Sequence, residues 1–489
     1  MTSLADAALF ARDGWRGAID HELPSIVVVG AGTALVVSGW LYHEHDTVKS
    51  VSVRLAAMSV DVLHHSMPRS DVFDAFGGRN ERAYRSGFWA IVPVRPVEER
   101  IGYWVTLEAE TSAGDRIEQE IVHVTLLPRV PDAVPSTAVA ADVVICMATH
   151  NPRVDLLERQ VRSIRDQTLR SWHCIVSDDS SDPPALDAIR RVLGDDPRFE
   201  LHSTDRRLGF YFNFESLLER VPAGTRFVAL ADQDDEWAPD KLATLRDALE
   251  RESAVLAFSD QRITRPDGSV VSPTFWATRT PYSEGLRPML VGNTVTGAAS
   301  LFRGELLSSL LPLPPMLLGS FHDHWLALVA LATGRIAYVD RVLSDYVQHP
   351  DQVLGHASGV EQPAARSRSQ SLARRAEDAY FNRVLLQRLY AKILLLRFAG
   401  RLGAGDRRLL ERVADGENSV LGVLDYAARA VVERRKETLG YHRESLLGLL
   451  WALAWEAPLQ RRPTGDLERG VHPTADLVRY RGAPLNFEI

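Results

Sequence analysis

The chain has 489 residues, of which 45% are hydrophobic and 25% charged, and this composition excludes a collagen-like, low-complexity or wholly disordered protein. Its 56 Lys and Arg residues against 64 Asp and Glu residues give a net charge of −8, so we expect no nucleic-acid partner. Two cysteines cannot build a disulfide framework and indicate a reducing compartment. No signal peptide and no apolar run of about 18 residues is found, so we expect a soluble cytoplasmic protein.

Residues 25–130 predict a β-sandwich. Stretches rich in β-branched and aromatic residues follow one another there, separated by Gly, Pro and Asp and without an intervening helical period. Strands that lack crossover helices pair through hairpins, which favours an antiparallel sandwich. We expect residues 1–24 to be an N-terminal extension and the Pro-, Ala- and Ser-rich residues 131–141 to be a linker.

Residues 142–357 alternate strand and helix patterns. The continuous apolar run over 143–149 is typical of a strand buried on both faces. Asn151 follows as the expected N-cap of a helix, with Pro152 at its first position and apolar residues at helical spacing after it. Further strands and helices alternate as far as 232, which predicts an α/β domain with a mostly parallel sheet and right-handed crossovers.

Residues 358–489 predict a helical C-terminal region that is rich in Arg, Leu and Ala. Two interpretations of its amphipathic pattern remain open. The basic and apolar faces suit peripheral contact with an anionic membrane, here the inner face of the cell membrane. They equally suit a packed helical subdomain or a contact between copies in a homo-oligomer, which we favour slightly.

Several acidic residues follow the predicted strands of the α/β domain. Asp178 and Asp179 end one strand, and Asp232, Asp234 and Asp235 end another. Ligands bind at the carboxyl ends of the strands in an open parallel sheet, so these side chains should share one rim. So much negative charge needs a cation, and Mg²⁺ usually binds one or two carboxylates together with substrate phosphates. The pattern predicts a metal-bridged phosphate ligand.

The alternative is a structural role, because Asp and Ser after a strand are common caps and turn formers. For Asp178, Asp179 and Ser180 this alternative is the stronger one. For Asp-Gln-Asp-Asp at 232–235 the ligand-binding interpretation is stronger, because a cap needs a single acidic residue.

Seven motifs in order carry a resemblance to a known family: VVICMATHNP, IVSDDSSD, RRLGFYFNFESLL, FVALADQDDEWAPDKL, NTVTGAASLF, HDHWLALVALATGRIAYVD and YVQH. Residues 143 to about 356 thereby resemble the family-two glycosyltransferases of GT-A fold, and most closely their bacterial rhamnosyltransferase-like branch. The resemblance implies a metal-dependent, inverting transfer of a sugar from a UDP- or dTDP-sugar donor. The implied acceptor is a hydroxyl of a cell-surface glycan or a lipid-linked glycan, and the implied cofactor is Mn²⁺ or Mg²⁺.

The resemblance also implies roles for individual residues. A carboxylate must take the proton of the acceptor hydroxyl, and Asp323 matches this catalytic base. Its alternative role is the N-cap of the apolar helix that follows. The other implied roles are the nucleotide site (Thr149, Asn151, Asp179, Asp232), contacts with the donor or acceptor sugar (Asn293, Thr296, Gly297, Trp325) and the metal site (Asp234, His349). For Trp325 packing in the core is the alternative.

Two features depart from the branch pattern. Arg207 stands where the branch commonly carries asparagine, and YVQH is followed by PDQVLGH rather than by glycine and asparagines. Two other functions fit the sequence less well. A non-catalytic glycan-binding scaffold would be expected to have lost at least one site residue, and a sugar-nucleotide pyrophosphorylase needs a glycine-rich basic loop after the first strand, where the chain reads HNPRVDLL. For the β-sandwich, acceptor binding and subunit association both remain open.

Overall fold

The computed structural model describes most of the chain, namely residues 10–128, 141–276, 281, 283–317, 319–349, 372–415, 422–424, 426–428, 439–456 and 478–481. The predicted linker over 131–141 lies outside these residues except for its last position. Among the residues described, no helix is both long enough and apolar enough to cross a bilayer.

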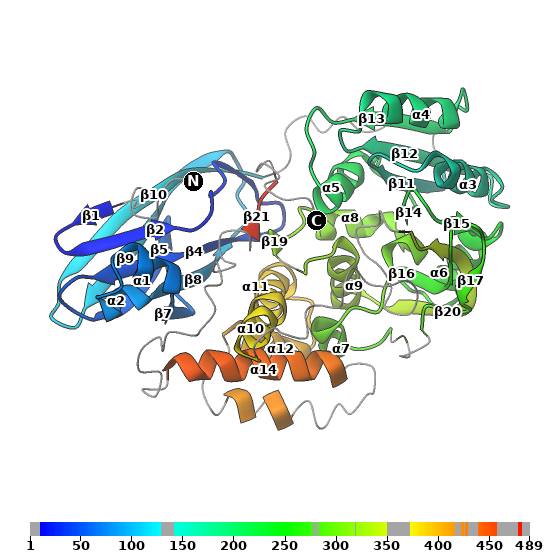
Figure 1. The fold of residues 1–489 in the computed structure, drawn as a ribbon. Helices are drawn as coiled ribbons and strands as arrows, with labels where there is room; N and C mark the ends of the chain where they lie inside the picture. The colour runs from blue at the N-terminus through cyan, green and yellow to red at the C-terminus, as the bar shows by residue number, and fades with distance from the viewer. Residues whose placement is uncertain are drawn as a thin grey trace.

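The N-terminal part is a β-sandwich of two five-stranded sheets (Figure 1). One sheet contains, in spatial order, β1 (Phe10–Arg12), β2 (Trp15–Ile19), β4 (Thr33–His43), β8 (Arg85–Val94) and β7 (His64–Pro68). The other contains β3 (Ile26–Val28), β10 (Arg116–Leu127), β9 (Ile101–Thr111), β5 (Val48–Leu55) and β6 (Met58–Asp61). Neighbouring strands are antiparallel except for β3, which is parallel to β10.

The prediction that residues 1–24 form an extension is wrong for residues 10–19. These residues form a hairpin, β1 and β2, and β2 pairs with β4. The hairpin turn is Asp13-Gly14, with φ of 51° and 81°, which is the dipeptide best suited to a two-residue hairpin. Two short helices also interrupt the strands, α1 (Ser70–Ala75) and α2 (Glu81–Tyr84). Trp40 and Tyr42 of β4 pack against them, so β4 is buried on both faces.

The predicted α/β domain has the GT-A type of mixed sheet. Strands β13 (Phe199–Ser203), β12 (Trp172–Asp178), β11 (Val143–Thr149) and β14 (Phe227–Ala231) are parallel neighbours. Beyond β14 the sheet becomes mixed and continues through β18 (Ser300–Arg303), β16 (Leu256–Thr264), β20 (Ile336–Val347) and β15 (Glu236–Trp237), with β17 (Val270–Ser272) paired to β16. The α/β prediction is confirmed.

Helices cover both faces of this sheet, because its strands alternate their apolar side chains between two cores. One core contains α3 (Val154–Arg165), α4 (Pro183–Leu193) and α6 (Lys241–Arg251). The other contains α5 (Phe210–Arg220), α7 (Leu286–Val291) and α9 (His322–Thr333). Short elements complete the domain: the 3₁₀ turns η1 (Gly297–Ala299) and η2 (Gly304–Leu306), α8 (Leu307–Leu310) and β19 (Met316–Leu317).

The predicted helix start at Asn151 is wrong. Helix α3 begins at Val154 with Arg153 as its N-cap, and Asn151 has a left-handed φ of 40°. Its side-chain oxygen accepts a hydrogen bond from the backbone of Asp182, 2.9 Å away on the next strand's loop. Asn151 therefore connects two loops rather than capping a helix.

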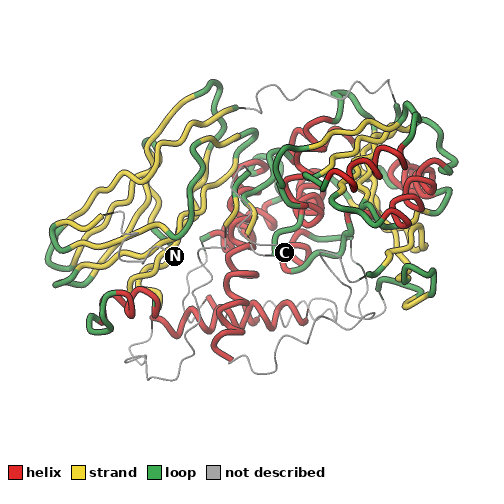
Figure 2. Tube along the Cα trace, turned by 45° about the horizontal axis from the view of Figure 1, so that its top comes forward, coloured by secondary structure: helices red, strands yellow, loops and turns green. Residues whose placement is uncertain are grey.

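The C-terminal region is helical and lies between the sandwich and the α/β domain (Figures 1 and 2). It contains α10 (Leu372–Ala379), the π-helical segment η3 (Tyr380–Leu385), α11 (Leu386–Phe398), α12 (Ala404–Ala414) and α14 (Leu439–Glu456). It also holds a strand, β21 (Val478–Arg479), which pairs with β19. One continuous hydrophobic core joins residues of all three parts.

Two polar side chains of this region connect the parts. The guanidinium of Arg397 donates to the carbonyl of Gly32 in the sandwich, 2.7 Å, and to those of Ser309, Leu310 and Pro312 in the α/β domain, 2.9, 3.1 and 2.7 Å. The hydroxyl of Tyr480 accepts from the Val36 N–H, 2.7 Å, and donates to the Val36 carbonyl, 2.8 Å. The C-terminal region therefore helps to hold the α/β domain and the N-terminal sandwich together.

Candidate active site

The carboxyl ends of neighbouring parallel strands bring the predicted residues together. Thr149, the last residue of β11, is in register with Asp178, the last residue of β12. Met147 is in register with Ala231, the last residue of β14. The loops that start at Asp179 and Asp232 therefore leave the same edge of the sheet, as the sequence pattern predicted.

Asp178 forms the turn after β12. It is completely buried and accepts hydrogen bonds from the Ser181 N–H, 3.0 Å, and the Ser203 hydroxyl, 3.2 Å. The hydroxyl of Thr149, itself buried, donates to Asp178 across 3.3 Å. The turn-forming alternative therefore describes Asp178, and the Thr149 side chain supports this turn from inside the sheet.

Asp179 holds the segment that begins helix α5. Its carboxylate accepts hydrogen bonds from the backbone N–H groups of Leu208 and Gly209, the latter at 2.8 Å. Gly209 has a φ of 80°, a conformation that favours glycine, and precedes the first residue of α5. A carboxylate offers about four acceptor positions, so Asp179 keeps capacity for a further donor.

Gln233 is a site residue that the sequence interpretation missed. Its side-chain oxygen accepts from the His150 N–H at 2.8 Å, and its amide nitrogen donates to the His150 carbonyl at 3.2 Å. This two-point contact fixes the loop after β14 against the loop after β11. The signal was present in the sequence, because the only amide in Asp-Gln-Asp-Asp can both donate and accept.

Asp234 and His349, 115 positions apart, are in direct contact. The Asp234 Oδ2 and His349 Nε2 atoms are 2.8 Å apart, and their side chains are only 15% and 5% exposed. Strand β15 makes this contact possible because it directly follows residues 232–235, here called the acidic loop. It pairs antiparallel with β20, so that Trp237 faces Ser344 and Glu236 faces Asp345. The structure therefore brings the two predicted metal residues together.

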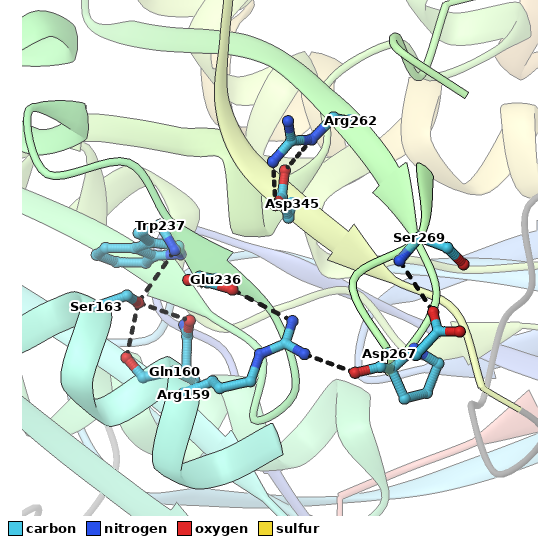
Figure 3. Close-up of polar contacts among 10 residues, drawn as sticks. Arg159, Gln160, Ser163, Glu236, Trp237, Arg262, Asp267, Ser269 and Asp345 are labelled. Carbon is cyan, nitrogen blue, oxygen red and sulfur yellow. Dashed lines mark hydrogen bonds and ion pairs between the residues drawn. The ribbon is translucent and has the colours of Figure 1, made fainter. Parts of the chain in front are cut away.

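Figure 3 shows how β15 is fixed to helix α3. The Trp237 N–H donates to the Ser163 hydroxyl at 3.0 Å, and Glu236 pairs with Arg159 at 3.2 Å (Figure 3). Arg159 also donates to the Pro266 carbonyl at 2.8 Å. These contacts hold the end of the acidic loop from the side opposite to β20.

The acidic loop carries more negative charge than the surrounding residues compensate. Burial, together with the charges of Asp234 and Asp323, raises the pKa of Asp232 to about 7. Burial and the charges of Asp234 and Asp232 raise the pKa of Asp235 well above its usual value. Burial lowers the pKa of Lys241 to about 7 even though Asp235 and Asp232 oppose this. A bound cation would relieve this excess of negative charge.

A divalent cation fits the Asp234–His349 pair. The two side chains, whose Oδ2 and Nε2 atoms are 2.8 Å apart beside the other carboxylates of residues 232–235, would hold the ion. A carboxylate with an imidazole suits Mn²⁺, and a carboxylate alone suits Mg²⁺. Over the described ranges, no group of three or more His, Cys, Asp or Glu side chains is arranged around a metal position. The other ligands would then be phosphate oxygens or water.

Asp323 lies in the first turn of α9, and Phe321 is the N-cap of that helix. The alternative in which Asp323 caps the helix is therefore wrong. Its carboxylate accepts from the Asn293 side-chain amide at 3.0 Å and from the Gly297 N–H at 3.1 Å. Burial raises the pKa of Asp323 to about 6, and hydrogen bonds from backbone N–H groups, that of Gly297 first among them, oppose the rise. The carboxylate is thus oriented, and its pKa is close to neutral pH, as a general base requires.

Of the four residues predicted to contact a sugar, two donate hydrogen bonds to Asp323, a third is next to one of these in sequence, and the fourth lies in the core. Asn293 and Gly297 donate to the Asp323 carboxylate, and Thr296 directly precedes the η1 turn that contains Gly297. Trp325 is completely buried, and its indole N–H donates to the Leu310 carbonyl at 3.0 Å. The prediction that Trp325 contacts a sugar is therefore wrong, because its ring packs in the core.

A known family matches this part of the chain. Residues 144–311 match the family model described as glycosyl transferase family 2. This segment is a glycosyltransferase family 2 domain. The match runs from β11 to α8 and so includes the acidic loop, Asn293 and Gly297, while Asp323 and His349 lie beyond its end.

Two curated proteins are similar to this glycosyltransferase domain. TuaG of Bacillus subtilis, whose name describes a glycosyltransferase of teichuronic acid biosynthesis, is 26% identical over 151 residues, which are 31% of this chain and 59% of TuaG. ExoW of Rhizobium meliloti, a succinoglycan biosynthesis protein, is 29% identical over 111 residues, which are 23% of this chain and 35% of ExoW. The chain thus spans about three fifths and one third of these relatives.

Solved structures also resemble the chain at low similarity. Residues 1–349 of TarS from S. aureus, in complex with UDP-GlcNAc, align at 14% identity over 62% of this chain and 90% of that one, with a TM-score of 0.38. The mannosyltransferase PcManGT of Pyrobaculum calidifontis, in complex with GDP-Man and Mn²⁺, aligns at 17% identity over 66% and 90%, with a TM-score of 0.34.

We predict that Gly297→Ala lowers the free energy of unfolding by about 1–3 kcal/mol, as overpacking of a filled site does. A β-carbon at this position would lie 3.0 Å from Nε2 of His322 and 3.3 Å from the β-carbon of Asp323. Urea unfolding measures the effect. Gly400→Ala is the control, because nothing lies within 4 Å of a β-carbon there. Equal stability of both variants would show that His322 and Asp323 can move aside.

Proposed function

We propose that the protein is a metal-dependent, inverting glycosyltransferase that moves a hexose from a UDP- or dTDP-sugar to a hydroxyl of a cell-surface glycan or lipid-linked acceptor. The observation that carries this proposal is the arrangement of Asp323. An oriented, half-buried carboxylate with a pKa of about 6 lies close enough to the acidic loop for its charge to raise the pKa of Asp232. In this proposal the base Asp323 therefore lies next to the position of the donor diphosphate.

Each part of the site has a chemical task in this proposal. Asp179 and Asn151 receive the nucleotide base at the loops after β12 and β11, and Asp232 lies toward the ribose. Asp234 and His349 would hold Mn²⁺ or Mg²⁺, which would supply positive charge to stabilise the departing nucleoside diphosphate. Asp323 accepts the proton of the acceptor hydroxyl as this oxygen attacks the anomeric carbon. One base opposite the leaving group leads to inversion in a single displacement.

The relatives suggest the class of acceptor. TuaG and ExoW are both named for the biosynthesis of bacterial polysaccharides, so a growing polysaccharide is the acceptor that we propose. Rhamnose is the donor sugar that the motif pattern of residues 143–356 favours. This chain differs from that pattern at Arg207, which stands in place of the usual asparagine and precedes Leu208, whose N–H donates to Asp179.

Calorimetric titration with UDP and dTDP, with and without Mn²⁺ or Mg²⁺, tests the proposal. We expect one nucleotide to bind in a metal-dependent manner, and Asp234→Ala to weaken this binding at least about tenfold, because loss of a ligand or its support commonly costs 10–100-fold in metal affinity. Asp187→Ala is the control, since Asp187 is an exposed residue paired with Arg190 on α4. Binding of neither nucleotide, or binding that metal and Asp234→Ala leave unchanged, would contradict the proposal.

A further inference from the structure

Lys241 is a buried cation that none of the roles above includes. It is the first residue of α6 and has no exposed surface. Its ammonium lies 3.7 Å from the centroid of the Trp237 ring and donates a hydrogen bond to the Ala298 carbonyl. Burying an ammonium costs free energy unless its charge and its donors are used, so this position calls for a specific role.

On one side, Lys241 compensates the acidic loop. Asp235 is buried and Asp232 half-buried, and Lys241 lies against the ring of Trp237, two residues after Asp235, where its ammonium opposes the rise in pKa of both carboxylates. These two carboxylates flank Asp234, which contacts His349. When protonated, the Lys241 ammonium therefore acts on the carboxylates that border the proposed metal position.

On the other side, Lys241 holds the turn that orients Asp323. Ala298, which accepts its hydrogen bond, belongs to η1 together with Gly297. The Gly297 N–H donates to Asp323 at 3.1 Å, and the Gly297 carbonyl accepts from the Ser300 hydroxyl at 2.7 Å. A shift of η1 would therefore move a donor of the proposed base.

We propose that Lys241 is a positioning residue that joins the two halves of the active site. Through its charge it keeps Asp232 and Asp235 compensated beside the diphosphate position, and through Ala298 it holds η1 where Gly297 orients Asp323. Lys241 itself contacts neither donor nor acceptor. This inference rests on the proposed glycosyl transfer, and it assigns the alignment of base and donor to one buried side chain.

Lys241→Met tests the proposal because methionine has a similar length but neither charge nor donor. We expect kcat, counted per nucleotide site titrated with UDP and Mn²⁺, to fall about 10²-fold, the loss that a misplacement of about 1 Å can cause. The number of UDP sites per chain and the KM for the donor should stay near their wild-type values. Lys241→Arg, which retains charge and donors, should recover part of kcat.

If Lys241 had a purely structural role, the measurement on Lys241→Met would give a different result. The substitution would lower the number of UDP sites in Lys241→Met and leave kcat per site unchanged, which would overturn the proposal. Lys392→Met is the matched control, because Lys392 is also largely covered, with a side chain 12% exposed, and pairs with Asp415 at 3.2 Å in the C-terminal region. If Lys241→Met does not fold, Lys241→Gln, which keeps a donor without the charge, replaces it in the same measurement.

A double-mutant cycle tests the charge compensation without any transfer reaction. Urea unfolding of Lys241→Met, Asp235→Asn and the double variant should show that the double variant loses less stability than the two single losses together. Additive losses would overturn the compensation, and Asp232→Asn replaces Asp235→Asn if the latter does not fold. A wild-type chain that transfers no sugar would refute the proposed function, while the cycle would still decide whether Lys241 compensates these carboxylates.

Discussion

Asp323→Asn is expected to lower kcat by about 10²–10⁴-fold, the contribution typical of a general base, while UDP binding in the presence of Mn²⁺ is kept. Asparagine has nearly the same shape but cannot take a proton from the acceptor hydroxyl. Its amide oxygen can accept from Asn293 or from Gly297, and so one of these two donors loses its partner. Initial rates and calorimetry on the same preparation separate the loss of proton transfer from a loss of donor binding.

The pH dependence of kcat gives an independent signature of the base. Because the pKa of Asp323 is about 6, the carboxylate is protonated below this pH and ionised above it. The rate of the wild-type chain should therefore rise as the pH increases through about 6. Asp232, whose pKa is about 7, can add a second inflection, so the inflection that disappears in Asp323→Asn is the one to assign to the base. Full activity of Asp323→Asn, or an unchanged profile, would contradict the assignment.

Arg397→Met is expected to lower the free energy of unfolding by about 3 kcal/mol or more, because each buried acceptor left without a donor costs about 1–3 kcal/mol. Gly32, Ser309 and Pro312 would lose the donor that the guanidinium provides. Leu310 would keep one, because its carbonyl also accepts from the Trp325 indole. Burial lowers the pKa of Arg397 to about 10, so removing the charge recovers part of the loss.

Urea unfolding followed by tryptophan fluorescence measures this effect. Arg401→Met is the control, since Arg401 follows the same helix but is exposed. A second transition in Arg397→Met would show that the sandwich and the α/β domain unfold separately once their connection is lost. A loss below about 1 kcal/mol, the size of an ordinary hydrogen bond, would mean that the hydrophobic core alone joins the parts.

The sequence predicted the elements of the α/β domain because its strands are buried on both faces. The largely apolar runs over 143–149 and 227–231 became the central strands β11 and β14. The hairpin of β1 and β2 was missed because its strands are only 3 and 5 residues long and carry arginines. The Asp13-Gly14 pair was the local signal that could have revealed it.

By itself, the sequence determined which chemical groups the site contains and that the acidic residues share one edge of the sheet, because parallel strands must end together. The tertiary structure decided what each group faces. Asp178 is buried and accepts a hydrogen bond within its own turn. Asp234 contacts His349 because β15 pairs with β20, and the Trp325 side chain packs in the core. The contacts of Lys241 with Ala298 and of Arg397 with Gly32 join residues 57 and 365 positions apart. Such contacts depend on the packing of whole elements, and no local pattern of residues carries that information.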